Sequence, residues 1–405
     1  MKKASVLRNI CYTVAASLLL NGVLQLFVYP RIHNTYGDAY YGDMLYLLSI
    51  ISIVAAGFGG APNYARMVAA NFDEQPNGDF NRCLLYSMGL LIPVAVLVTY
   101  PFGLAQTLLM CALTCVTVLR YYGEVNFKLS LNFRRFFLYY VCVVVGYCAG
   151  LFLLRLWGMW EIAFLLGETL AVLFAVGFGT TFRRPLLQKS PQLHANLRTA
   201  AVLICSELLC AGALNADRVM IKLMLDAESV SVFYTATLIG KMAAMLTGPL
   251  SNVIMGYLAR SRDAITPRRF LLFEGIILLC SAVGVAACCV ASGIFVRLLY
   301  PDLYDAAKPY FLLGNAAQLL YFANNIGMAV ILFFSKGRHQ FYINAGYVLL
   351  LVLLSAILIR TNGLIGMAVG MLLANGMKFL VVALLGARFI RTAGANPCGK
   401  EKEAL

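Results

Sequence analysis

The chain has 405 residues, of which 61% are hydrophobic and 12% are charged, with a mean hydropathy of +0.81. Soluble domains carry about 25% charged residues, so this composition excludes an ordinary soluble protein. The formal net charge of +14 does not indicate nucleic-acid binding, because the basic residues lie at the ends of apolar runs and form no basic–aromatic patch.

Apolar runs recur roughly every thirty residues along the chain. A hydrocarbon core about 30 Å thick requires about 20 residues of helix to cross it. The first run follows a basic start, but it is too long for a signal peptide and no A-x-A-like cleavage site follows it. We therefore predict twelve uncleaved transmembrane helices, at residues 9–29, 42–61, 83–101, 103–121, 136–155, 161–181, 199–223, 231–258, 270–298, 307–335, 341–359 and 363–387.

Lys and Arg cluster in every second gap between these runs. The richest clusters lie at residues 120–135, 183–198, 260–269 and 388–402, and three further basic residues lie within residues 1–8. Because basic loops stay on the cytoplasmic side, this alternation predicts a multi-pass protein of the bacterial inner membrane with both termini in the cytoplasm. The predicted outward gaps are short and hold only Arg31, Arg155, Arg297, Lys308 and Arg360.

The basic linker at residues 182–198 leaves six predicted spans on each side. We therefore expect two domains, residues 1–190 and 191–405, the second ending in a short cytoplasmic tail. A weak internal similarity, between residues 41–66 and 234–260, agrees with two related halves. Transporters are often built from such repeats, with the substrate path at the repeat interface.

Several short motifs are distributed along the chain. Gly37–Gly42 precedes an apolar helix that reaches the glycine-rich segment Gly57–Pro62, and Asp217–Lys222 is followed by Ser231–Tyr234. These segments resemble motifs of the bacterial polysaccharide repeat-unit flippases, although Ser231 stands where that family usually has glycine. The similarity continues through Leu299–Asp302, Ser335–Gly337 and Gly363–Ala368.

The resemblance implies membership of the multidrug/oligosaccharidyl-lipid/polysaccharide exporter superfamily. Its members have an all-α fold, in which two six-helix bundles form a V around a central cavity. The resemblance further implies that the substrate is an oligosaccharide linked to an isoprenyl pyrophosphate, which is an anionic lipid.

Ionisable residues at membrane depth are candidates for function, because an isolated charge there costs roughly 2.5–3.5 kcal/mol or more. Arg66 follows the expected helix break at Gly59–Pro62, which places it near the inner rim of the cavity. Its guanidinium could bind a pyrophosphate bidentately. The alternative is an ordinary anchor at the inner membrane surface.

Glu207 lies nine residues beyond Arg198, about 13 Å along a helix and therefore close to the midplane. We predict that it couples transport to an ion or gates the two halves, with a simple interhelical ion pair as the alternative. Glu168 and Glu274 are shallower, and we expect each of them to be paired at an interface.

Arg218 and Lys222 are four residues apart and share one helix face. Together with Lys241 they would make the second domain's wall of the cavity basic and suited to a phosphate-bearing substrate. Asp217 would neutralise part of this charge and contribute to gating. Lys378, midway along the last span, pairs within the bundle or meets the lipid carrier.

These residues predict a flippase that moves a lipid-linked oligosaccharide from the inner to the outer leaflet by alternating access. The first alternative is a cation-coupled multidrug exporter of the same superfamily. The second is a membrane glycosyltransferase or polymerase, but enzymes of these classes usually have a large outward loop, and none is predicted here.

We predict no enzymatic activity, no catalytic residues and no cofactor. The sequence has no G-x-x-x-x-G-K-[ST] loop, no C-x-x-C pair and three widely separated histidines, so we expect neither ATP hydrolysis nor a metal site. The sequence leaves open whether protons or sodium ions drive transport. Membrane lipids, and a polymerase or glycosyltransferases of the same pathway, are the expected partners.

Overall fold

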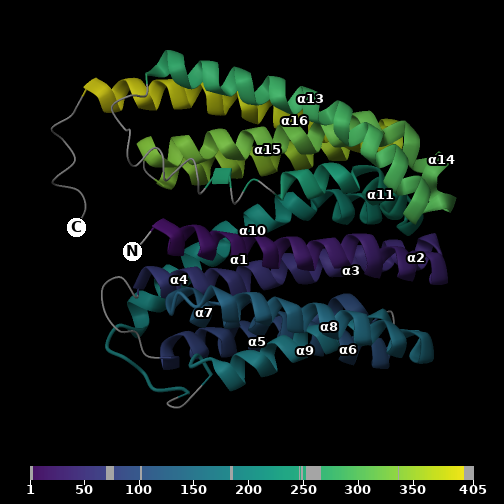
Figure 1. The fold of residues 1–405 in the computed structure, drawn as a ribbon, viewed down its shortest axis with the longest axis vertical. Helices are drawn as coiled ribbons and strands as arrows, with labels where there is room; N and C mark the ends of the chain where they lie inside the picture. Colours follow the sequence, from purple (N-terminus) through teal and green to yellow (C-terminus); the bar gives the residue numbers. More distant parts are fainter. Residues whose placement is uncertain are drawn as a thin grey trace. The chain divides into compact units, whose positions relative to one another are not determined.

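The computed structural model describes residues 3–69, 77–100, 103–182, 186–245, 247, 250–251, 266–335 and 337–395. All regular structure in these ranges is helical (Figure 1). Parts of the predicted basic segments and of the third and eighth predicted spans (residues 1–2, 70–76, 101–102, 183–185, 246, 248–249, 252–265, 336 and 396–405) lie outside the described residues. The helices are α1 (Lys3–Val23), α2 (Tyr29–Tyr36), α3 (Asp38–Ala55), α4 (Ala61–Ala69), α5 (Asn77–Thr99), α6 (Leu104–Gly123), α7 (Val125–Leu129), α8 (Phe133–Trp157), α9 (Trp160–Phe178), α10 (Leu193–Met224), α11 (Ala227–Ala244), α13 (Pro267–Leu299), α14 (Tyr304–Ala307), α15 (Phe311–Phe334) and α16 (Gly337–Ala395).

A helix is present at each of the twelve predicted spans. By length and composition, nine helical segments of the described chain can cross a membrane. The last of them, within α16, has a kink at Gly363 (φ +57°), a backbone conformation that glycine adopts readily. It therefore holds the two spans predicted at 341–359 and 363–387. The chain is thus a helical protein with several membrane spans.

The expected helix break at Gly59–Pro62 is not present. A π-helical turn, η2 (Ala56–Gly60), leads directly from α3 into α4, so the chain remains helical from Asp38 to Ala69. Gly59 does not end the helix but allows close packing on α6, because a Cβ at this position would overlap the backbone of Val118. A second π-helical turn, η1 (Leu24–Val28), joins α1 to α2 in the same way.

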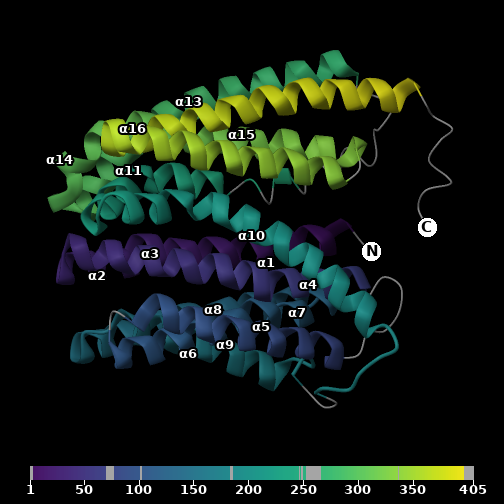
Figure 2. The same ribbon diagram turned by 180° about the vertical axis from the view of Figure 1, so that it is seen from behind.

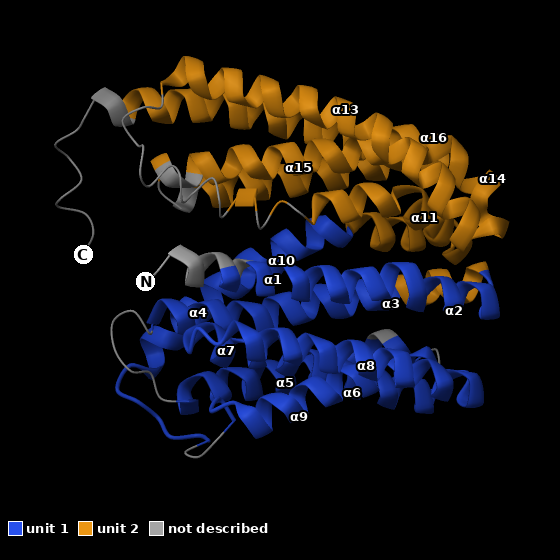
Figure 3. Cartoon of the chain, viewed as in Figure 1, with its two compact units in different colours: residues 1–37, 46–215 blue, residues 38–45, 216–405 orange. Residues whose placement is uncertain are grey.

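The helices divide into two compact units (Figure 3). Unit 1 comprises Met1–Gly37 and Tyr46–Asn215, and unit 2 comprises Asp38–Leu45 and Ala216–Leu405. Both α3 and α10 contribute residues to each unit. The units are therefore not separated at the basic linker, and the two domains expected at 1–190 and 191–405 remain a prediction.

In unit 1, α8 and α9 pack closely through small residues. Gly146 lies against Gly167, and Gly150 lies against Ala163, so that a Cβ on either α8 glycine would overlap the backbone of α9. This is the spacing of a G-x-x-x-G motif, which lets membrane helices approach each other closely. A second core joins α4 and the N-terminal part of α10 through Ala65 and Ala200 (Figure 2).

In unit 2, α13, α15 and α16 lie side by side (Figure 1), and α11 packs on α15. Buried amides join these helices, since Asn315 accepts a hydrogen bond from the Gly240 backbone N–H at 2.8 Å and Asn324 donates to the Asn375 carbonyl at 3.0 Å. Such interhelical bonds satisfy polar groups that hydrocarbon cannot satisfy.

The start of α3 belongs to unit 2, where three of the sequence motifs meet. Gly42 packs so closely on α11 that a Cβ would overlap the Ala227 carbonyl oxygen. The Ser231 hydroxyl donates to the Asp38 carbonyl at 2.6 Å, and the Tyr41 and Tyr300 hydroxyls are 3.2 Å apart. The motifs therefore form one packing junction at the start of α3 and α11.

Candidate functional site

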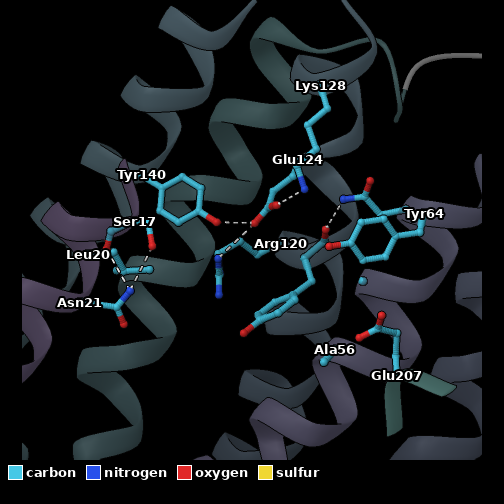
Figure 4. Close-up of a pocket in the computed structure, with 13 residues that line it drawn as sticks. Ser17, Leu20, Asn21, Ala56, Tyr64, Arg120, Glu124, Lys128, Tyr140 and Glu207 are labelled. Atoms are coloured by element: carbon cyan, nitrogen blue, oxygen red, sulfur yellow. Dashed lines mark hydrogen bonds and ion pairs between the residues drawn. The ribbon is translucent and has the colours of Figure 1, made fainter. Parts of the chain in front are cut away.

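Unit 1 contains a polar cavity of about 300 Å³ (Figure 4). Residues from α1, η2, α4, α6, α7, α8 and α10 surround it. They include the amides of Asn21 and Asn63 and the phenols of Tyr64 and Tyr140. A lining this rich in hydrogen-bonding groups is expensive at membrane depth and marks the cavity as a candidate site.

A chain of buried ion pairs forms one wall of this cavity. The Arg120 guanidinium pairs with Glu168, and one of its terminal nitrogens lies 3.7 Å from Glu124. Glu124 also accepts from Lys128 at 2.8 Å. The Tyr140 hydroxyl donates to Glu124 at 2.6 Å (Figure 4), so this carboxylate has three partners. The four-residue spacing of Arg120, Glu124 and Lys128 places them on one helical face.

Sequence reasoning assigned no site role to Arg120, Glu124 or Lys128, because it counted the two basic residues as part of an inner basic segment. Their spacing of four was the available signal. Glu168 confirms the expectation of interface pairing, since the Tyr147 hydroxyl donates to it at 2.5 Å in addition to its ion pair with Arg120.

Glu207, the predicted coupling residue, lies on α10 and lines the same cavity, with its carboxylate on the side of Tyr64 (Figure 4). It is only partly buried, and it forms no ion pair with any residue that the structure describes. The wall carries two cations and two anions that neutralise each other, so none of its cations is left to compensate the Glu207 carboxylate. Carboxylate, amide and phenol oxygens of this kind suit a proton or a hard cation.

Arg66 does not line the cavity. Its guanidinium donates to the Tyr122 hydroxyl at 2.9 Å and to the Asn77 side-chain oxygen at 2.5 Å, and it lies 5.9 Å from the centre of the Phe80 ring. These contacts join α4 to α5 and α6. They favour the anchoring alternative, and substrate binding by Arg66 remains a prediction.

In unit 2, the structure brings together three of the predicted residues. The carboxylate of Asp217, 1% exposed, pairs with the Lys241 ammonium. The Arg218 guanidinium and the Lys241 ammonium lie 4.7 and 4.6 Å from the centre of the Tyr234 ring. Cations at this distance are attracted to an aromatic ring.

Lys222 is separate from this group, because it pairs with Asp43 at the start of α3 and both side chains are partly exposed. Lys378 is buried on α16, where its ammonium lies 4.5 Å from the centre of the Tyr347 ring and 5.6 Å from that of Tyr321. We call Asp217, Arg218 and Lys241, with Tyr234, the cationic cluster.

Glu274 differs from the expectation that it is paired. It is 2% exposed, and neither carboxylate oxygen has a hydrogen-bond partner among the described residues. The oxygens pack against the α15 backbone at Gly327, which leaves no room for a side chain there. This could not be predicted from the sequence, because the partners of a carboxylate depend on tertiary packing.

The chain was also compared with known proteins. The sequence matches no protein-family profile, and no curated protein matches it. Solved structures do match. The lipid II flippase MurJ in an inward closed conformation has a TM-score of 0.73 and 14% identity, over 96% of this chain and 90% of that one.

The inward-facing conformation of a multidrug resistance MATE family transporter of the MOP superfamily has a TM-score of 0.67 and 15% identity, with 96% of both chains covered. A MATE transporter in its bent conformation has a TM-score of 0.58 and 13% identity, over 98% of this chain and 97% of that one. At this level of identity the likeness establishes the fold alone, which is the helical fold of these transporters.

Proposed function

We propose that this chain is a flippase that moves an oligosaccharide linked to an isoprenyl pyrophosphate from the inner to the outer leaflet of the bacterial inner membrane. The fold supports transport without enzymatic chemistry, because its solved relatives are a flippase and multidrug transporters. The anionic substrate is supported by the cationic cluster, in which Arg218 and Lys241 both lie over the Tyr234 ring and Lys241 pairs with Asp217.

In this mechanism the two domains rock around a central cavity, and both termini remain in the cytoplasm. The pyrophosphate binds to Arg218 and Lys241 while the isoprenoid tail stays in lipid. A guanidinium binds phosphate oxygens in pairs, whereas an ammonium acts as a point charge. Lys222 contributes less, because Asp43 already neutralises it. A polymerase and glycosyltransferases of the same pathway would supply and consume the substrate.

We assign the energy source of this cycle to a proton or sodium gradient, with Glu207 as the residue that binds the ion. This assignment is supported by the position of Glu207 in a polar cavity, where it has no neutralising cation among the described residues. Asp217 acts with it by holding Lys241 in place between substrates.

A cation-coupled multidrug exporter is the second candidate function. The cavity of unit 1 favours it, because Tyr64, Tyr121 and Tyr140 surround a carboxylate there. Tyrosine rings and a carboxylate bind organic cations. The two candidates therefore assign the substrate to different units of the chain.

A transport assay with the purified full-length chain in liposomes tests the flippase proposal. A labelled isoprenyl-pyrophosphate oligosaccharide reports flipping, and a cationic dye reports drug export. We expect Arg218→Gln to slow flipping by about tenfold or more, because a hydrogen bond to a charged group contributes about 1.5–3 kcal/mol.

Arg297→Gln is the matched control. Arg297 also lies over a tyrosine, 5.8 Å from the centre of the Tyr304 ring, but it is exposed. It should leave flipping unchanged. Dye transport without any flipping of the oligosaccharide would contradict the proposal and support the exporter.

A further inference from the structure

A second cavity in unit 1, of about 590 Å³, lies between η1, α2 and the C-terminal end of α8. It is distinct from the polar cavity, because it shares none of the residues that line it. On α8, about 16 Å of helix separates Tyr140 of the polar cavity from Leu151 of the second one. The hydrogen bond from the Tyr36 hydroxyl to the Leu154 carbonyl, 2.9 Å long, holds α2 against α8.

The lining of this cavity is amphipathic along its length. Phe27 and Arg31 are four residues apart, and so are Leu151 and Arg155, so each arginine lies one helical turn beyond an apolar residue on the same face. Phe152 adds a further apolar side chain, and it is 77% exposed. The cavity is thus cationic at one end and apolar about one turn deeper.

The two arginines differ from the buried basic residues of this chain. Neither guanidinium forms an ion pair or a hydrogen bond with a described residue, whereas Arg120 and Lys241 are each paired with a carboxylate. Both arginines are exposed. Two like charges that line one cavity repel each other, so an anion between them would be stabilised.

We propose that this cavity binds an anionic phospholipid of the surrounding membrane. Arg31 and Arg155 hold its phosphate, and an acyl chain lies along Phe27, Leu151 and Phe152. A free anion would use only the cationic end and leave the apolar length of the cavity unused. A zwitterionic lipid carries its own ammonium, which competes with the arginines for the phosphate. Both helices end at the membrane face that the basic clusters predict to be outward, so the lipid belongs to that leaflet.

Binding of phosphatidylglycerol to the purified full-length chain tests this proposal. Lipid is titrated into detergent micelles that contain the protein, and bound lipid is counted by native mass spectrometry, with phosphatidylcholine as the zwitterionic comparison. Each basic residue near an anionic lipid increases the binding affinity for that lipid about fivefold. The variant R31Q/R155Q should therefore bind phosphatidylglycerol about 25-fold more weakly while its unfolding temperature stays unchanged.

Arg360→Gln is the matched control, because Arg360 is also exposed in a predicted outward segment but belongs to unit 2 and does not line this cavity. It should bind phosphatidylglycerol as the unmodified chain does. The variant R31K/R155K keeps both charges but loses bidentate geometry, so it should show an intermediate loss, and it decides the test if the glutamine variant does not fold. The proposal is overturned if R31Q/R155Q retains full affinity, if Arg360→Gln loses as much, or if phosphatidylcholine or inorganic phosphate binds as tightly as phosphatidylglycerol.

Discussion

At the scale of single residues, two glutamates that are buried to nearly the same extent have opposite surroundings. Glu168 is 3% exposed and has Arg120 and Tyr147 as partners, whereas Glu274 is 2% exposed and has none among the described residues. A buried carboxylate without partners would cost several kcal/mol if it were ionised. Glu168 therefore compensates a buried guanidinium, whereas Glu274 compensates no cation among the described residues.

This difference predicts the effect of one substitution made at both positions. Glu168→Gln leaves Arg120 buried without its main partner and should reduce the free energy of unfolding by about 3–5 kcal/mol. Glu274→Gln keeps the shape of the side chain and removes no ion pair or hydrogen bond among the described residues, so it should leave the free energy of unfolding nearly unchanged. Unfolding temperatures of the two variants in detergent provide the measurement. An equal loss in both variants would show that Glu274 has a charged role that the structure does not reveal.

Glu207 carries a second prediction at this scale. Because it has no ion pair with a described residue, Glu207→Gln should fold normally but change how transport depends on the applied proton or sodium gradient. Transport into liposomes at several imposed gradients measures this. Glu228→Gln serves as the control, since Glu228 is exposed in the first turn of α11. A Glu207→Gln variant with the gradient response of the unmodified chain would reduce Glu207 to a packing residue.

At the scale of helices, the apolar runs were sufficient to predict a helix at each of the twelve spans, because about 20 residues of helix must cross the hydrocarbon core. They did not predict the short helices α2, α7 and α14, which lie almost entirely outside those spans. They could not predict the π-helical turns at Leu24–Val28 and Ala56–Gly60, which depend on local packing between helices. Packing between helices also explains why the glycines of Gly57–Pro62 wrongly predicted a helix break. Gly59 instead allows close contact with α6.

The packing junction at Gly42 gives a prediction for the elements it joins. Gly42→Ala places a methyl group against the Ala227 carbonyl, so α3 and α11 must separate locally, and we expect a loss of about 1–3 kcal/mol. Gly212→Ala is the control, because a Cβ there meets nothing within 4 Å and alanine favours a helix over glycine. Thermal unfolding of both variants distinguishes them. A Gly42→Ala variant as stable as Gly212→Ala would mean that this junction contributes little to the fold.

At the scale of the whole molecule, the sequence predicted a helical membrane protein, and the solved transporters of the same fold confirm that class. The candidate site was predicted only in part. Arg218, Lys241 and Asp217 do lie together, and Glu207 lines a cavity, but Arg66 and Lys222 have other partners. The depth of a charged residue in the membrane can be predicted from its position in a span. Its partners lie on helices that are distant in the chain, so they can be identified only from the tertiary structure.

The central claim is that the chain moves a lipid-linked oligosaccharide between leaflets. The most direct test measures the leaflet distribution of this intermediate in cells that lack the protein, before and after the unmodified chain or its Arg218→Gln variant is restored. We predict that the intermediate accumulates on the inner leaflet, and that the unmodified chain releases it while the variant does so poorly. An unchanged distribution, with efflux of a cationic dye that follows expression of the chain, would contradict the flippase and identify a drug exporter.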